Sequence, residues 1–269
     1  MLKRIAVLAL VTMLAICGQT KANMQGTYQW LGKTGASDPF YGFTILILNM
    51  TGVNGSTVFT DTSFKHRGNA AVTGNAQIST TTAPPNGTGA LLLDGSGDFL
   101  SYPNNADFSL AASNSDQYTV EAFVNMTSFP GGSNSIIYSY ADAIGSFSWT
   151  MFMPPMGGEF SFLFSPDGSA TTTITSTGAS ISTGTWYYLA VDKDATGKIR
   201  LYRNTVMVGS ATPADSSMFS PGVIFFGIGT TSGGVTSLDG RLVLRITKGI
   251  ARCASDAGCP VPLVPFPTD

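Results

Sequence analysis

The chain has 269 residues, of which only 11% are charged, and it contains 31 glycines and 17 phenylalanines. Its formal net charge is −2 and no basic run follows the first few residues, which argues against a nucleic-acid partner. Without a targeting segment, the length suits one large all-β domain, since sandwiches reach roughly 200–250 residues as a single domain.

The first 22 residues have the pattern of a secretory signal peptide. A positive start at Lys3 and Arg4 is followed by an apolar stretch over residues 5–16 and by small side chains before residue 23. This apolar stretch is shorter than the roughly 20 residues that cross a bilayer, so we expect no stable membrane span. A lipoprotein signal ending at Cys17 is an alternative. Either pattern predicts an exported protein that is secreted, periplasmic or at the cell surface.

The exported part divides into three predicted segments. Residues 23–40 form an N-terminal arm, residues 41–252 form a β-sandwich, and residues 253–269 form a proline-rich tail that we expect to run extended over the surface. The tail carries Cys253 and Cys259, and an even pair of cysteines in an exported chain predicts a disulfide that closes a small loop.

Short apolar runs separated by turn residues fill the middle segment. Residues 43–48 are continuously apolar, which predicts a strand buried on both faces. Residues 118–126 alternate with period 2, which predicts a strand with two different faces. Further strands are expected at 136–140, 147–152, 160–164, 171–175, 206–208, 223–228 and 241–247.

Two hairpins are predicted, and no stretch has a convincing helical period. One hairpin joins residues 90–93 to 99–102 across a glycine-rich turn, and the other joins 186–191 to 198–202. Many short strands with turn signals at roughly 8–12-residue spacing indicate a sandwich or a barrel.

Four segments, in order, are similar to motifs of the laminin-G-like, concanavalin A-like jelly rolls. They are residues 91–100, 118–124, 186–191 and 238–249. The chain most resembles the single-domain versions of bacterial surface proteins and bacteriophage genomes. The resemblance implies a two-sheet antiparallel jelly-roll sandwich. One departure is that the closing strand lacks the acidic pair that usually precedes its arginine, so the contacts of those acids are absent or rebuilt.

The carboxylates argue against an enzyme. Glycoside hydrolases on this fold need two carboxylates that flank the scissile bond. The chain has only two glutamates, Glu121 and Glu159, and neither stands in an E-x-D-x-x-E pattern. The resemblance implies a structural role for Glu121 within the sheet. The single histidine, His66, lies in a polar loop without a nucleophile elbow.

Two aspartates are candidate ligands for a calcium ion. Many laminin-G-like domains hold one Ca²⁺ at the rim of the sandwich, and the resemblance implies Asp142 and Asp239 as its candidate ligands here. Calcium prefers such hard oxygen ligands. The alternative is that both aspartates only form turns, as Asp does without any metal.

Four aromatic residues are candidates for stacking on sugar rings: Tyr140, Trp149, Tyr187 and Tyr202. Sugar binding uses exposed aromatic faces together with polar groups for the hydroxyls. Alternation does not tell which face of a strand is covered, so burial of each ring in the core is the alternative.

Two functions are compatible with these features. The resemblance implies a non-enzymatic binding module that recognises a glycan or a surface polysaccharide. The alternative is a structural or decorating component of a virion or cell surface, which contacts other proteins. Exposure of the apolar loop at residues 151–156 would favour the alternative.

Overall fold

The structure, a computed structural model, describes residues 38–141, 146–222, 225–230 and 238–268. These residues form 17 strands and two three-residue 3-10 helices, η1 (Tyr41–Phe43) and η2 (Ala106–Phe108). In this part of the chain no helix has the length and apolar character needed to cross a membrane. The predicted signal peptide and nearly all of the predicted arm lie outside the described residues.

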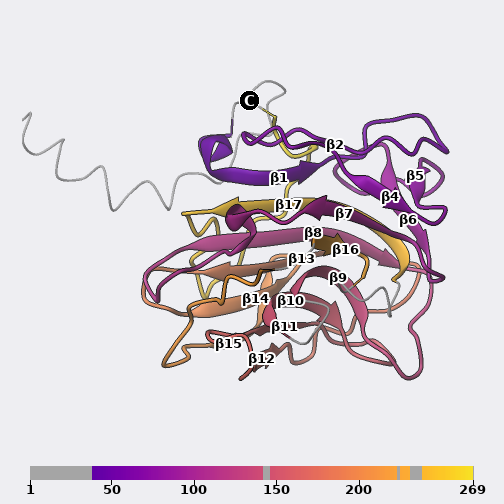
Figure 1. Ribbon diagram of the computed structural model, residues 1–269. Helices are drawn as coiled ribbons and strands as arrows, with labels where there is room; N and C mark the ends of the chain where they lie inside the picture. Colours follow the sequence, from indigo (N-terminus) through magenta and orange to yellow (C-terminus); the bar gives the residue numbers. More distant parts are fainter. Residues whose placement is uncertain (1–37, 142–145, 223–224, 231–237, 269) are drawn as a thin grey trace, which may run out of the picture. The chain divides into compact units, whose positions relative to one another are not determined.

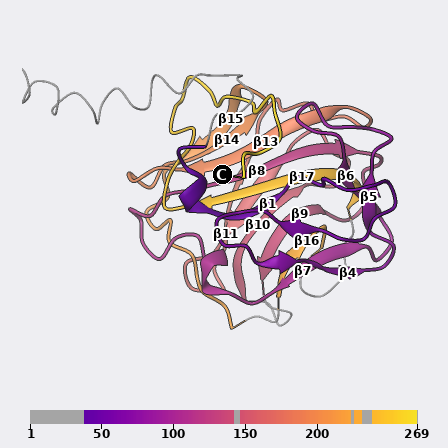
Figure 2. The same ribbon diagram turned by 90° about the horizontal axis from the view of Figure 1, so that it is seen from above.

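Two antiparallel sheets form the sandwich (Figures 1 and 2), which confirms the predicted fold class. The larger sheet has eight strands, and β1 (Thr44–Leu48) pairs with one half of its strand β17. The path through the other seven is β15 (Val206–Ala211), β14 (Ile199–Arg203), β13 (Trp186–Lys193), β8 (Tyr118–Met126), β17 (Asp239–Lys248), β6 (Ala90–Asp94) and β5 (Gln77–Ser79).

The second sheet has seven strands and faces the first. Tyr118 of β8 packs against Phe162 of the second sheet, with ring centroids 6.0 Å apart. A separate two-stranded sheet joins β2 (Thr60–Asp61) to β3 (Gly68–Asn69). The seven strands are, in order, β12 (Thr172–Thr175), β11 (Ser161–Phe164), β10 (Phe147–Met153), β9 (Ser135–Ala141), β16 (Phe225–Ile228), β7 (Phe99–Pro103) and β4 (Ala71–Thr73).

The outer face of the eight-stranded sheet is covered by the C-terminal tail. Every residue of β8 is buried, although its side chains alternate between the inter-sheet core and this outer face. Phe266 is only 1% exposed and packs on Phe123, and the amide of Asn49 bonds the backbone of Phe266 at 2.7 and 2.9 Å. The expectation of a tail running over the surface is therefore wrong at Phe266, although Leu263 is 77% exposed.

One of the two predicted hairpins is wrong. The hairpin of β13 and β14 is confirmed, but β6 and β7 belong to different sheets. The turn between them carries the chain from one sheet to the other, and the Asp98 carboxylate holds it by accepting from the backbone N–H groups of Asp94 and Asn75. Gly95 and Gly97 take positive φ values of 81° and 78° there, which glycine adopts without strain.

Candidate functional site

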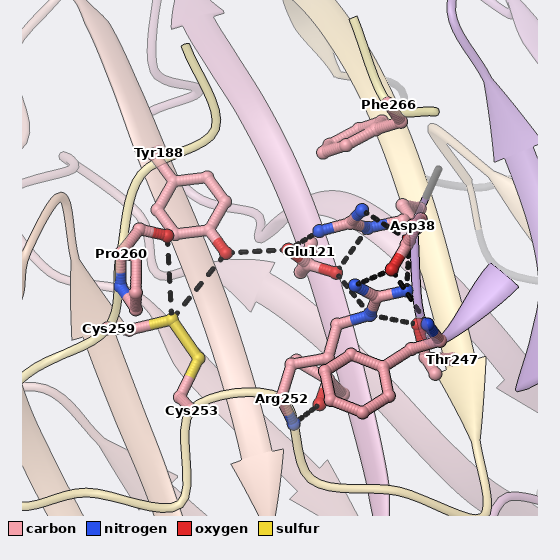
Figure 3. Close-up of polar contacts among 12 residues, drawn as sticks. Asp38, Glu121, Tyr188, Thr247, Arg252, Cys253, Cys259, Pro260 and Phe266 are labelled. Atoms are coloured by element: carbon pink, nitrogen blue, oxygen red, sulfur yellow. Dashed lines mark hydrogen bonds and ion pairs between the residues drawn. A yellow bond between two sulfur atoms is a disulfide. The ribbon is translucent and has the colours of Figure 1, made fainter. Parts of the chain in front are cut away.

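Four charged side chains form a buried cluster on the outer face of the eight-stranded sheet (Figure 3). Arg245 of β17 stands opposite Glu121 of β8 in the strand register. Its Nε and Nη2 donate to the two Glu121 oxygens, both at 2.6 Å, in a bidentate pair. Asp38 and Arg252 complete this group, which we call the ionic cluster.

Asp38 precedes β1 and Arg252 follows β17, and both side chains join the ionic cluster. Arg252 Nη2 lies 2.6 Å from Asp38 Oδ2, and Arg245 Nη1 lies 3.4 Å from the same oxygen. Burial alone would raise the pKa of the Asp38 carboxyl, but Arg252 and Arg245 outweigh it and hold the pKa below its ordinary value. The two cations and two carboxylates balance, so the cluster is internally neutral.

The ionic cluster is enclosed within the fold. The Glu121 side chain is 1% exposed and also accepts from the Tyr188 hydroxyl at 2.7 Å, so its oxygens are bonded to donors of the chain itself. The other glutamate, Glu159, accepts hydrogen bonds from Ser176 Oγ and from the backbone of Gly178 and Ala179. Both glutamates therefore have structural roles, as the resemblance implied for Glu121.

The predicted disulfide is present between Cys253 and Cys259, with a Cα–Cα distance of 4.9 Å. Asp192 holds the start of the loop, because its carboxylate accepts from the backbone N–H groups of Cys253 and Ala254. At the end of the loop, the Tyr188 hydroxyl lies 3.6 Å from Cys259 Sγ (Figure 3). The disulfide thus fastens the tail beside the ionic cluster.

The four aromatic residues expected to stack on sugar lie in the core. Tyr140, Trp149 and Tyr202 are 0% exposed and Tyr187 is 8% exposed. Tyr140 and Trp149 point between the sheets, where both contact Phe226. Their ring faces are covered by protein, so these four rings offer no stacking surface.

Only one of the two expected calcium ligands, Asp239, lies among the described residues. Asp142 lies outside the described residues. Asp239 begins β17, and its Oδ2 accepts a hydrogen bond from Ser128 Oγ at 2.6 Å. Over the described residues, no group of three or more His, Cys, Asp or Glu side chains could hold a metal ion. Asp239 here has the surroundings of a residue that fixes a strand end.

A hollow of about 310 Å³ lies at the end of β7, on the rim of the sandwich. We call it the rim hollow. It is lined by Lys65, Arg67, Tyr102, Pro103, Asn104 and Asn105. Asp107 pairs with both cations, with Oδ2 at 2.6 Å from Arg67 Nη2 and 3.3 Å from Lys65 Nζ. The hollow therefore presents cations that already have a partner, together with two exposed amides.

Two of the buried aromatic residues donate hydrogen bonds to the segment that contains Asn104 and Phe108. The Tyr140 hydroxyl donates to Asn104 Oδ1 at 2.6 Å, and Trp149 Nε1 donates to the Phe108 carbonyl at 2.7 Å. The Arg67 guanidinium lies over the Phe108 ring at 4.6 Å. The structure shows no hydrogen bond from Asn104 Nδ2 to another described residue, so this amide is oriented and available to donate.

An exposed aromatic ring stands on the loop that supplies Lys65 and Arg67. Phe64 is 54% exposed, and it meets the half-buried Tyr41 edge-on with ring centroids 6.0 Å apart. This pair was not among the residues predicted to stack on sugar. The sequence signal that points to it is an aromatic residue directly before three consecutive basic residues, Lys65, His66 and Arg67.

Sequence comparison identifies a family over more than half of the chain. Residues 94–243 match the profile of a family described as the Concanavalin A-like lectin/glucanases superfamily. No curated protein matches the sequence.

Solved structures resemble this fold at low sequence identity. The binding domain of Paraclostridial Mosquitocidal Protein 1 has a TM-score of 0.58 and 12% identity, with 79% of this chain and 51% of that chain covered. The receptor binding domain of botulinum neurotoxin C/D mosaic serotype has a TM-score of 0.54 and 15% identity, with 79% and 49% covered. The binding domain of Botulinum Neurotoxin DC, in complex with SialylT, has a TM-score of 0.53 and 11% identity, with 79% and 49% covered. This chain spans about half the length of each, and the likeness concerns the fold.

Proposed function

The chain belongs to the Concanavalin A-like lectin/glucanases superfamily, and from this premise we propose that it is a non-enzymatic, exported module that binds a glycan at the rim hollow. The observation that carries the proposal is the set of groups gathered there. Asn104 and Asn105 present exposed amides and Lys65 an exposed ammonium, and the exposed ring of Phe64 directly precedes Lys65 in the chain. Binding domains among the similar structures, one of them in complex with SialylT, support a recognition role.

The chemistry of the rim hollow suits the hydroxyl groups of a sugar. Amide and ammonium N–H groups donate to hydroxyl oxygens, and an exposed aromatic ring covers the apolar face of a pyranose. Lys65 and Arg67 share one carboxylate partner, Asp107, so a single positive charge is left over. Because both cations are already paired, we expect the hollow to take a neutral sugar unit.

The carboxylates support a binding module in preference to a hydrolase. A glycosidase needs two carboxyl groups that face a shared substrate. Glu121 is enclosed by arginines in the eight-stranded sheet, and Glu159 is bonded to the segment after β12. No carboxylate lines the rim hollow. We propose no catalytic residue.

Export and calcium form part of the same proposal. The signal-like pattern of residues 1–22 supports a secreted, periplasmic or cell-surface location, with a virion surface as the alternative. A bound Ca²⁺ would use Asp239 and Asp142, and its presence is tested by chelation.

A glycan array with the exported chain, residues 23–269, tests the proposal. It is run once with calcium and once with a chelator, and we expect saturable binding to a defined glycan. Lys65→Ala and Asn104→Ala should each weaken binding by about ten-fold, since each loses one polar contact of about 1.4 kcal/mol. Lys198→Ala is the matched control, because Lys198 also pairs with an aspartate, Asp256, at 2.7 Å. An equal loss of glycan binding in the control variant, or no glycan binding by the native chain, would reject the rim hollow as the glycan-binding site.

One observation favours the alternative function, a structural or decorating component that contacts other proteins. Met156 is 80% exposed between β10 and β11, although Met151 and Met153 of the same predicted loop are buried. An exposed methionine at the tip of a turn is a suitable contact for a protein partner. This function would be supported if the glycan array is negative and a protein partner binds the native chain but does not bind the Met156→Asp variant.

A further inference from the structure

Three neighbouring side chains on the outer face of the eight-stranded sheet form a second candidate site. In the strand register, Asn125 of β8 stands opposite Trp186 of β13 on one side and opposite Arg241 of β17 on the other. Side chains directly opposite each other lie on the same face, with Cβ atoms about 4.5–5.5 Å apart. We call these three residues the donor row.

Each member of the donor row has a buried hydrogen-bond donor without an acceptor. Trp186 Nε1, Asn125 Nδ2 and Arg241 Nε have no hydrogen-bond partner within the part of the chain that the structure describes. Asn125 is only 2% exposed. Buried polar groups in native proteins are nearly always bonded, so three orphan donors at adjacent register positions indicate that an acceptor from outside the chain belongs there.

The charge of Arg241 defines the chemistry of that acceptor. No carboxylate among the described residues pairs with Arg241 (the salt bridges of the described arginines involve Arg67, Arg200, Arg245 and Arg252). A guanidinium is planar and matches a carboxylate with two parallel hydrogen bonds. Arg241 and Trp186 are both only half-buried, so a ligand can approach the row from the exposed parts of these two side chains.

We propose that the donor row binds the carboxylate of an acidic saccharide, such as a uronic acid unit, with the Trp186 indole against the sugar ring. The inference rests on the proposed function in one respect, that the ligand is a glycan. It concerns a different site, because both cations of the rim hollow pair with Asp107 whereas Arg241 has no such partner among the described residues. The saccharide carboxylate accepts from Arg241 and Asn125, while the Trp186 indole donates its Nε1–H to a hydroxyl oxygen of the same sugar unit and supplies apolar contact.

Nuclear magnetic resonance of the exported chain tests the proposal directly. The indole Nε1–H signal of Trp186, assigned by its loss in Trp186→Phe, is followed during titration with a trisaccharide of galacturonic acid. The matching neutral trisaccharide of galactose is the reference ligand. We expect a saturable shift of this signal with the acidic trisaccharide and a much smaller one with the neutral trisaccharide.

Two variants and a matched control assign the binding to the donor row. Arg241→Gln should weaken the acidic trisaccharide by about ten-fold or more, as expected for a lost charged hydrogen bond. Asn125→Asp should abolish binding, because the new carboxylate pairs with Arg241 and repels the ligand. Arg203→Gln is the control: Arg203 is half-buried and its Nε also lacks a partner, but its register neighbours Leu189 and Val206 are apolar.

The outcomes separate this inference from the proposed function. Unchanged affinity in a folded Arg241→Gln protein, equal shifts with both trisaccharides, or no shift with the acidic one would overturn the donor row as a saccharide site. Glycan binding that is lost in Asn104→Ala would still stand in those cases, because it reports on the rim hollow. Conversely, a titration sensitive to Arg241 supports the donor row even when the rim hollow binds nothing.

Discussion

Two arginines of β17 face β8 on the same outer surface, yet their surroundings are opposite. Arg245 stands opposite Glu121 and donates two hydrogen bonds to it at 2.6 Å. Arg241, four residues earlier, stands opposite Asn125 and has no carboxylate partner among the described residues. A buried arginine with an internal partner contributes to the fold, whereas one without a partner is suited to receive a ligand. The residue across the register decides which role an arginine takes.

The largest expected effect comes from removing the partner of Arg245. Glu121→Gln keeps the shape of the side chain but leaves Arg245 and Arg252 in the core with only Asp38 to balance them. Breaking a buried ion pair from one side costs about 3–5 kcal/mol, so the free energy of unfolding should fall by that amount. Urea denaturation measures it. Arg241→Gln is the comparison and should change stability by less than about 1 kcal/mol, while equal losses would contradict the distinction between the two arginines.

The disulfide should contribute less than the ion pairs. Replacing Cys253 and Cys259 by serine removes a short loop closure, and the free energy of unfolding should fall by about 2 kcal/mol. The loosened tail should also increase amide hydrogen exchange at Phe123, which packs on Phe266, more than at Asn125. A uniform increase along β8 would show that the tail does not protect Phe123 selectively.

The ionic cluster should give the protein a defined acid sensitivity. The pKa of Asp38 is lower in the folded protein than its ordinary value of 3.8, since Arg252 and Arg245 outweigh the effect of burial. The stabilisation is therefore complete above pH 3.8 and is lost as the pH falls from 3.8 through the folded value. Thermal melts between pH 2 and 6 should show a shallower acid branch for Asp38→Asn than for the native chain. Acid branches of equal slope in the two proteins would show that Asp38 does not contribute to the acid sensitivity.

The smallest expected effect comes from giving Arg241 an internal partner. Asn125→Asp places a carboxylate opposite this arginine, as Glu121 is placed opposite Arg245. Arg241 is half-buried but Asn125 is only 2% exposed, so the new ion pair must also offset the cost of burying the carboxylate, and the gain in stability should not exceed about 1 kcal/mol. Urea denaturation detects the change. A loss of stability would mean that the surroundings of Asn125 do not accept a charge, and Asn125→Gln would then separate charge from size.

Much of the fold was predictable because its signals are local. The alternation of residues 118–126 predicted β8 with its observed bounds, and the hairpin of β13 and β14 was predicted from two apolar runs and a turn. The wrong hairpin of β6 and β7 has the same local pattern. The two strands enter different sheets, which depends on distant partners that local periodicity does not contain.

The candidate sites were less predictable because they depend on register and on covered faces. Alternation places Tyr140 on one side of its strand, but only the facing sheet makes that side the core. The donor row joins residues of three strands that are far apart in the sequence. The rim hollow likewise joins the loop of Lys65 to the loop of Asn104. In both sites the residue types are common ones, so only their proximity in the folded chain identifies the site.

The position of β17 has a consequence for the order of folding. This strand is the last of the described strands, yet it lies between β8 and both β6 and β1. The edge of β8 that pairs with β17 therefore stays unpaired until residues 239–248 have been synthesised. Contacts between distant parts of the chain, such as Asn49 with Phe266, form later still. Such long-range pairing makes folding slow and cooperative. A ribosome-bound chain should gain its stable sheet only after β17 has emerged, in one late step that inserts this strand.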